Sequence, residues 1–424
     1  MTARGGVGDA LRSTSPRTAA AIAVAGVAVL LASSLPPPSR LFSYPDRGDI
    51  ALYFDYAQRT FEGQVPYRDF TVEYPPGFLA PLLAPGPADH GYYDRFRVLM
   101  LVLGAAAVVL LVVALFLAGA GAVELAAGVL VFATLPLTLT PDLVFERFDL
   151  WPAVLVLLAL AALLRGRRTV GLAALGVGTA AKLYPLAIVP LAILARRGRA
   201  HVRRDLAVVT SAALVLVLPF AIVAPRGVGH VGWLLVRRPL HVESLGASIL
   251  LVAHRLGVYE PTIYLSFAGS WDLAGPAAKV VAVVGSLAEA AALIGVWFLF
   301  ARTSRGPRDL LLASAAAVVG FVVFGKVFSP QYLVWVAAVT PLALGRVRVF
   351  ALSATVVVAL LTRYIYDDGY NDLLQAGRTS WVMFARNVVL FALFCSLVLE
   401  LAARARTSAD TPTDAVTTSD TVSL

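Results

Sequence analysis

The chain has 424 residues, of which 59% are hydrophobic and only 14% are charged. Soluble domains are about 45–50% apolar and about 25% charged, so this composition excludes a soluble protein. The mean hydropathy of +0.80 instead indicates a polytopic membrane protein. A single cysteine excludes an intramolecular disulfide, and five scattered histidines give no zinc motif.

Long apolar runs predict an all-α polytopic fold, because backbone polar groups in lipid must be paired within helices. We predict about twelve transmembrane or partly spanning helices, at 18–35, 97–118, 122–140, 150–164, 169–181, 183–195, 206–224, 277–301, 309–325, 331–345, 349–365 and 381–403. The segments 169–181 and 183–195 are too short to cross a hydrocarbon core of about 30 Å alone. We therefore expect a hairpin of shortened or tilted helices, joined at Lys182.

Three regions follow from these spans. We expect a cytoplasmic N-terminus (1–17), a transmembrane domain (18–403) and a disordered cytoplasmic tail (404–424), the tail being rich in Ser, Thr and Asp. The domain carries two large outer loops, at 36–96 and 225–276. The eleven later spans favour a retained first helix over a cleaved signal peptide.

Basic residues fix the predicted orientation, because short cytoplasmic loops carry an excess of Arg and Lys. With the N-terminus in the cytoplasm, 18 of the 35 basic residues fall in the short segments of one side. They are Arg4, Arg12, Arg17, Arg165, Arg167, Arg168, Arg196, Arg197, Arg199, Arg203, Arg204, Arg302, Arg305, Arg308, Arg346, Arg348, Arg404 and Arg406. The net charge of +9 therefore reflects topology and contact with lipid, and not nucleic-acid binding.

The first outer loop holds the most varied chemistry. It combines carboxylates with aromatic residues, namely Asp46, Asp49, Asp55, Glu62, Asp69, Glu73, Asp89 and Asp94 with Tyr44, Tyr53, Phe54, Tyr56, Tyr67, Phe70 and Tyr74. This mixture is typical of sugar sites, where rings pack on the sugar and carboxylates bind or deprotonate hydroxyl groups. The segment 50–60 is predicted to form a short helix at the membrane interface.

Further polar residues lie at the outer ends of spans. Arg147 and Asp149 precede the fourth span, Lys182 joins the short pair, and Lys326 lies between the ninth and tenth spans. The second outer loop adds His230, Arg237, Arg238, His241, Glu243 and His254. Charges near membrane depth are costly, which makes these residues functional candidates.

Each of these features also has a structural interpretation. A loop carboxylate such as Asp49 is often only solvated, and Lys182 and Lys326 can extend to the interface without binding anything. Arg147 and Asp149 can form a structural pair at a helix start, where Asp149 would be a good N-cap. From the residues alone, both interpretations stay open.

Several motifs together resemble a known family. They are Gly63, Pro66-Tyr67-Arg68-Asp69-Phe70, Glu73-Tyr74-Pro75-Pro76-Gly77, Arg147-Phe148-Asp149, Lys182-Leu183-Tyr184-Pro185, and Lys326 with Phe328-Ser329-Pro330-Gln331-Tyr332. This set, within residues 45–335, resembles the polyprenol-phosphate-mannose-dependent α-mannosyltransferases of bacteria. Those enzymes belong to the GT-C superfamily of membrane glycosyltransferases, so the resemblance implies a GT-C type fold.

The resemblance implies a lipid-linked sugar donor used on the extracytoplasmic face, with no cofactor and no metal. By position, Asp49 matches the family's catalytic base, and Asp46 and Asp55 are the alternatives. This base would deprotonate the acceptor hydroxyl for a single inverting displacement, with polyprenyl phosphate as the leaving group. Lys182, Lys326 and Arg147 are the expected donor-phosphate ligands, in that order.

The resemblance also implies the remaining contacts and the location. The expected substrate-binding residues are Tyr53, Asp69, Glu73, Tyr74, Asp149, Tyr184, Gln331 and Tyr332. The expected partners are a polyprenyl-phosphate sugar, a glycolipid or glycan acceptor and membrane lipids, with no nucleic acid. The protein would lie in the inner (plasma) membrane with both termini in the cytoplasm.

Two other functions remain as alternatives. A secondary transporter would also have about twelve spans and a broken helical pair, but its polar residues would gather at the bilayer midplane, where Glu289 is the clearest charge. A polymerase or ligase of lipid-linked glycans would act on the same face with an oligosaccharide-diphosphate donor. The depth of the polar residues separates the enzyme classes from the transporter.

Overall fold

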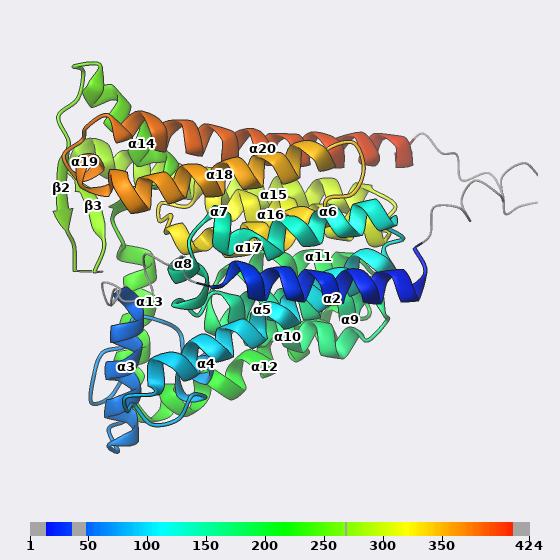
Figure 1. Cartoon of the computed structure of the whole chain (residues 1–424), viewed down its shortest axis with the longest axis horizontal. Coiled ribbons are helices and arrows are strands. Elements are labelled where there is room, and N and C mark those ends of the chain that lie inside the picture. The colour runs from blue at the N-terminus through cyan, green and yellow to red at the C-terminus, as the bar shows by residue number, and fades with distance from the viewer. Residues whose placement is uncertain (1–13, 36–47, 268, 410–424) are drawn as a thin grey trace, which may run out of the picture.

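The computed structural model describes residues 14–35, 48–267 and 269–409, and most of these residues are helical (Figure 1). Asp46, one of the alternative bases, lies outside these residues, as do 1–13 and 410–424. The last helix extends to Ala409. Residues 404–409, which the sequence assigns to the predicted cytoplasmic tail, are the last residues of this helix.

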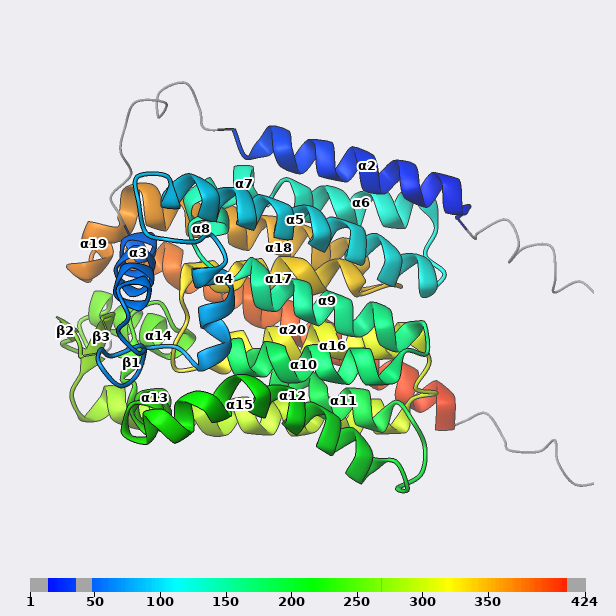
Figure 2. The same cartoon turned by 90° about the horizontal axis from the view of Figure 1, so that it is seen from below.

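Seven helices of the described residues are long and apolar enough to cross a membrane. They are α2 (Pro16–Ser33), α5 (Tyr92–Leu117), α12 (Val202–Val223), α15 (Pro276–Arg302), α16 (Pro307–Phe324), the continuous run of α18, η6 and α19 (Arg348–Leu374) and α20 (Thr379–Ala409). They run side by side along the long axis of the molecule (Figures 1 and 2). A membrane protein with an all-α fold is thus supported, and the number of twelve spans stays a prediction.

The other five predicted spans form shorter helices. They are α6 (Ala122–Ala133) with α7 (Leu135–Thr138), α9 (Leu150–Leu164), α10 (Arg168–Ala181), η3 (Tyr184–Ile188) with α11 (Val189–Leu194), and η4 (Pro330–Tyr332) with α17 (Leu333–Val339) and η5 (Thr340–Leu342). Prolines lie at the breaks because proline lacks the N–H that would continue the helical ladder. The predicted pair of short helices on either side of Lys182 is confirmed.

Burial separates the core helices from the periphery. In α16, 78% of the most apolar window is buried, whereas in α12 and α15 only 6% is buried. Helix α9 is also buried along most of its length and packs against α5 and α10. A helix that is apolar on all sides and exposed along its length has its apolar surface facing lipid. Helices α12 and α15 therefore form the outer wall of the bundle.

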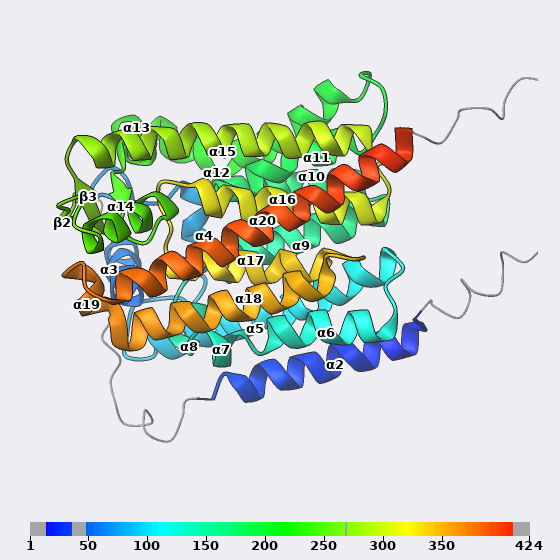
Figure 3. The same cartoon turned by 90° about the horizontal axis from the view of Figure 1, so that it is seen from above.

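One end of the bundle, the arginine end, carries the turns α9–α10, α11–α12 and α15–α16 and the start of α18. The start of α2 and the end of α20 lie at this end too (Figure 3). Its arginines tie the turns together: Arg305 Nη1 donates to the Leu194 carbonyl over 3.1 Å, and Arg308 Nε donates to the Ala118 carbonyl over 3.0 Å. The basic segments of the sequence therefore meet at one end of the molecule.

The opposite end, the loop end, holds the irregular elements. They are α3 (Gly48–Phe61), η2 (Pro76–Phe78), α4 (Leu79–Leu83), α8 (Pro141–Phe145), α13 (Pro225–Arg237), α14 (Leu245–Arg255), η6 (Ile365–Gly369), α19 (Tyr370–Leu374) and a sheet of β1 (Leu240–His241), β2 (Thr262–Leu265) and β3 (Trp271–Ala274). The sheet is antiparallel in the order β1-β3-β2, with Leu240 opposite Leu273 and Tyr264 opposite Asp272. Helix α3 confirms the predicted short helix at 50–60 and runs across the bundle (Figure 1).

A buried ion pair fixes the small sheet to the bundle. Arg386 of α20 donates from Nη1 to the Glu243 carboxylate over 2.8 Å and from Nη2 to the Glu243 carbonyl over 2.6 Å. The guanidinium also lies 4.1 Å from the centroid of the Phe328 ring. Both charged side chains are buried. The segment after β1 is therefore held against α20 by paired and hydrogen-bonded charges, as a buried ion pair requires.

The first loop and α13 touch at a glycine. Tyr67 has a positive φ of 68°, and its hydroxyl donates to the Tyr74 carbonyl over 2.8 Å. A methyl group at Gly227 of α13 would lie 1.9 Å from the Tyr67 carbonyl oxygen. Only a residue without a side chain allows this approach, so Gly227 sets the distance between α13 and the first loop.

We expect Gly227→Ala to destabilise the protein by about 1–3 kcal/mol, because the added methyl group must displace the backbone of the first loop. Thermal unfolding in detergent, followed by tryptophan fluorescence, measures the change. Gly229→Ala is the matched control on the same helix, because nothing lies within 4 Å of a methyl group there. Equal unfolding temperatures for the two variants would contradict the close approach.

Candidate functional site

The loop end contains a buried ion pair between two predicted site residues. Lys182 Nζ, at the end of α10, donates to Asp149 Oδ1 over 2.7 Å. The Trp335 indole N–H of α17 donates to the same oxygen over 2.8 Å. Asp149 is fully buried, and the Lys182 side chain is 11% exposed. The consecutive helices α9 and α10 and the distant helix α17 therefore meet at one carboxylate.

Four aromatic rings enclose the Lys182 ammonium group. Its nitrogen lies 4.4 Å from the ring centroid of Phe148, 5.0 Å from Trp335, 5.3 Å from Tyr332 and 5.6 Å from Tyr74. Cation–π attraction at these distances favours the charged form of the amine. With Asp149, the rings form an aromatic cage around the cation. The predicted phosphate ligand Lys182 therefore already has a counter-charge within the protein, the Asp149 carboxylate.

A stack of rings extends the cage. Trp335 stacks on Tyr184 at 4.2 Å between centroids and on Tyr332 at 3.9 Å. On the other side, Tyr74 and Phe148 pack edge to face at 5.0 Å. The predicted substrate-binding residues Tyr74, Tyr184 and Tyr332 are therefore brought together. Tyr184 is buried against Trp335 and so lies behind the cage.

Asp49 and Arg147 form a second ion pair beside the cage. Arg147 Nε lies 3.2 Å from Asp49 Oδ2, and the Asp49 side chain is 32% exposed. Asp49 is in the first turn of α3. Arg147 is held in place because the next two residues, Phe148 and Asp149, belong to the cage. The predicted catalytic carboxylate is thus partly open to solvent and next to a cation.

The predicted N-cap position of Asp149 is confirmed, but the contacts of Arg147 and Asp149 differ from those of a capped helix start. Asp149 occupies the N-cap position of α9, but its side chain makes no capping hydrogen bond. It binds Lys182 and Trp335 instead, and Arg147 pairs with Asp49. The two neighbouring residues therefore do not pair with each other.

A third carboxylate, Glu73, lies close to Asp49 and to Arg238. Burial raises the pKa of Glu73, and the Asp49 charge raises it further, while Arg238 opposes the shift. Arg238 follows α13 directly and donates from Nη2 to the Ser270 hydroxyl over 3.3 Å. The second outer loop therefore places a cation near Glu73 of the first loop.

Several other predicted residues lie outside this cluster. Asp69 binds Arg68 at 2.9 Å and accepts from the Val65 N–H, which lowers its pKa to about 2. Gln331 accepts a hydrogen bond from the Ser329 hydroxyl over 2.7 Å. Both have local structural partners that shape a turn.

Three further candidates, Lys326, Tyr53 and Asp55, each have other contacts. Lys326 Nζ donates to the Val236 carbonyl at the end of α13 over 2.6 Å. Tyr53 is fully buried among Phe78 and Phe96, with centroids 5.3 and 5.5 Å away. Asp55, one of the alternative bases, faces away on α3 and pairs with Arg59 at 3.0 Å.

Sequence reasoning missed two residues of the site, Trp335 and Phe148, which line the cage. Arg238 was among the functional candidates of the second outer loop but was given no specific role. Phe148 stands between two residues that were selected, and Trp335 is one helical turn beyond Tyr332. That spacing places Trp335 on the same helical face as Tyr332, which is the signal that could have identified it.

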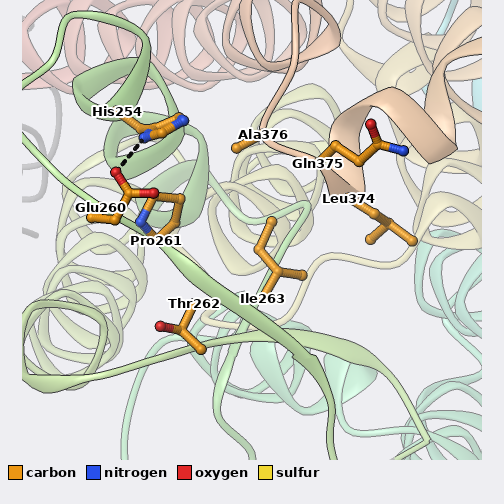
Figure 4. Close-up of a pocket in the computed structure, with 8 residues that line it drawn as sticks. All are labelled: His254, Glu260, Pro261, Thr262, Ile263, Leu374, Gln375 and Ala376. Atoms are coloured by element: carbon orange, nitrogen blue, oxygen red, sulfur yellow. Dashed lines mark ion pairs between the residues drawn. The ribbon is translucent and has the colours of Figure 1, made fainter.

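A separate pocket of about 360 Å³ lies between α14, β2 and the turn after α19. Figure 4 shows His254 and Glu260 on one side, 3.4 Å apart, and Leu374, Gln375 and Ala376 on the other. None of the lining residues belongs to the cage around Lys182 or to the Asp49–Arg147 ion pair. Within the described parts of the chain, no group of three or more His, Cys, Asp or Glu side chains could hold a metal ion.

Comparisons with known proteins give no relative. No protein-family model matches the sequence, and no curated protein matches it. The functional argument therefore depends on the residues and their geometry.

We expect Lys182→Met to destabilise the protein by about 3–5 kcal/mol, because it leaves the buried Asp149 carboxylate without its counter-charge. The double variant Lys182→Met with Asp149→Leu should recover much of this loss, since neither charge then remains buried. Thermal unfolding of the two single variants and the double variant gives the coupling free energy between Lys182 and Asp149. Additive effects of the two substitutions would contradict a direct ion pair.

The raised pKa of Glu73 predicts a pH-dependent stability. The folded protein holds this proton more tightly than the unfolded chain does, so stability falls as pH rises from the ordinary value of 4.5 through the folded pKa. Glu73→Gln removes the effect, and wild type should lose stability relative to this variant across that window. Glu62→Gln, just after α3, is the control. A difference between wild type and Glu73→Gln that stays constant with pH would contradict the shift.

Proposed function

We propose that the protein is a membrane glycosyltransferase. It would move a sugar, with mannose as the first candidate, from a polyprenyl-phosphate donor to an envelope glycolipid or glycan acceptor. The observation that carries the proposal is the partly exposed Asp49 beside Arg147, at the end of the bundle opposite the arginine turns. The family resemblance of the sequence motifs supports the same reaction class and the GT-C type.

In the proposed reaction Asp49 is the general base. Its carboxylate accepts the proton of the acceptor hydroxyl as that oxygen bonds to the anomeric carbon. The bond from this carbon to the phosphate oxygen breaks at the same time, and polyprenyl phosphate leaves with the electron pair. The single displacement inverts the configuration at the anomeric carbon, and no cofactor is consumed.

Arg147 is the cation nearest to the proposed base. Because the leaving oxygen departs from the face of the anomeric carbon opposite the base, Arg147 would hold the departing phosphate only after its guanidinium exchanges Asp49 for the donor. A fixed positive charge stabilises a charge that develops in the transition state. Lys326 is the second candidate. We assign Lys182 a positioning role, since its ammonium group is occupied by Asp149 and four rings.

The depth of the charged groups supports an enzyme over a transporter. Asp49, Glu73 and Arg147 come from loop-end elements, and Asp149 and Lys182 lie at the loop-end termini of α9 and α10. A transporter would place such groups at the midplane of its spans. With the arginine end in the cytoplasm by the positive-inside rule, the site would face the extracytoplasmic side of the plasma membrane.

We expect Asp49→Asn to abolish sugar transfer and leave the fold intact, because the amide keeps the size of the side chain and cannot accept the proton. Membranes with each variant would receive radiolabelled polyprenyl-phosphate mannose and an envelope lipid extract, and label in new glycolipid would be measured. Asp55→Asn is the matched control on the same helix, with an exposed carboxylate paired to Arg59.

Three outcomes decide the assignment. Transfer by wild type and Asp55→Asn but not by Asp49→Asn supports the proposal. Near-normal transfer by Asp49→Asn removes Asp49 as the base. If wild type transfers sugar from no member of a panel of polyprenyl-phosphate sugars, the proposed glycosyltransferase assignment is lost. Oligosaccharide-diphosphate donors and transport would then be assayed.

A further inference from the structure

An exposed aromatic surface lies on the loop end, formed by α13 and the β2–β3 hairpin. His230 stacks on Trp233 at 5.4 Å between centroids, and Trp233 packs on Phe267 at 5.2 Å. Val236 and Leu265 flank these rings and are 74% and 61% exposed. We call these five residues the aromatic ledge. Its rings contact each other, yet their outer faces are not covered by the described chain.

Helix α13 is amphipathic in a way that separates the ledge from the core. Val231 and Leu234 are buried against the bundle, while Trp233 and Val236 point outward. Arg226 and Arg237 stand exposed near the two ends of the same helix. An exposed apolar cluster flanked by arginines is the pattern of a helix that lies in a membrane interface.

The ledge is continuous with the apolar outer wall of the bundle. Helix α12, which leads into α13, exposes Leu218, Ile222 and Val223 in its last turns. Helix α15 exposes Val280 and Val283 directly after its first turn. On the side that faces the bundle, the ledge therefore borders a surface that lipid would cover.

The length of α12 places the ledge at the boundary of that lipid. Its 22 residues rise about 1.5 Å each and so extend about 33 Å, close to a hydrocarbon core of about 30 Å. Pro225 then begins α13, which runs across the bundle end (Figure 1). A helix that turns at this point lies along the membrane surface.

We propose that the aromatic ledge is a membrane-interface anchor. Trp233 and Phe267 insert into the boundary between lipid headgroups and acyl chains, and Arg226 and Arg237 contact lipid phosphates. The occupant of the surface is the bilayer leaflet at the loop end. This proposal concerns lipid contact alone and does not depend on the reaction.

The anchor would set the depth of the candidate site. Arg238 follows α13 directly, and Lys326 donates to the Val236 carbonyl within the ledge. Glu73 lies near Gly269, which is two residues beyond Phe267 in the hairpin. A methyl group added at Gly269 would lie 3.6 Å from the Glu73 carboxylate oxygen. Lipid contact at the ledge therefore holds these charged side chains at the level of the lipid phosphates.

Depth-dependent fluorescence quenching tests the anchor. In a Cys395→Ser background, single cysteines replace Trp233, Val236 or Phe267 and carry a bimane label in lipid nanodiscs. Phospholipids brominated near the headgroup or near the chain end are the quenchers. Leu287→Cys is the deep control, because Leu287 is 66% exposed on α15. Glu260→Cys is the aqueous control, because its side chain is 88% exposed.

We expect the ledge labels to be quenched several-fold more than the label at Glu260, and more by shallow than by deep bromines. The label at Leu287 should show the reverse depth preference. Ledge quenching no stronger than at Glu260 would overturn the anchor. Protection of the ledge labels by soluble glycan, with no lipid quenching, would also overturn it and identify a carbohydrate platform. Where one variant fails to fold, the other two report on the same surface.

Discussion

The ion pair between Lys182 and Asp149 is the contact on which the loop end depends. Removing two ions from water costs on the order of several kcal/mol for each ion. Here the cost is offset by the 2.7 Å contact itself, by the Trp335 N–H on the same oxygen and by four aromatic rings around the ammonium group. Because each group comes from a different segment, the pair fixes where α9 begins and where α10 ends. Arg147, two residues before Asp149, is thereby placed beside Asp49.

The sequence predicted the elements of this arrangement better than its contacts. Apolar runs identified the helices of the bundle, because a chain in lipid must satisfy its own backbone. They did not identify α13 and α14, which lie in the predicted second outer loop. The breaks near Pro136 and Pro341 were harder to predict, since these prolines divide runs that are continuously apolar. The partners of Asp149 were not predictable, because residues 33 and 186 positions away approach it only in the folded chain. A local rule suggested an N-cap, and tertiary packing overrode it.

Charge is divided between the two ends of the molecule. At the arginine end, guanidinium groups bind backbone carbonyls of neighbouring turns and pair with carboxylates such as Asp205 and Asp309, which are 4% and 10% exposed. At the loop end, Lys182 pairs with the buried Asp149, and Arg147 pairs with Asp49, which is 32% exposed. Asp49 is thus more accessible to a ligand than Asp205 or Asp309. The proposed anchoring of the aromatic ledge would place Asp49 and its neighbours at the membrane surface, where the proposed lipid-linked donor and lipid acceptor both have their polar groups.

Photo-crosslinking with a donor analogue tests the central claim most directly. A photoreactive group on the sugar of a polyprenyl-phosphate donor would be activated in membranes that contain the protein, and mass spectrometry would locate the labelled peptides. We predict labelling of α3, of the segment that contains Arg147, and of the α13–β1 connection at Arg238, with competition by unmodified donor. Labelling confined to the interior of α15 around Glu289, or to the pocket at His254, would contradict a site built on Asp49 and Arg147.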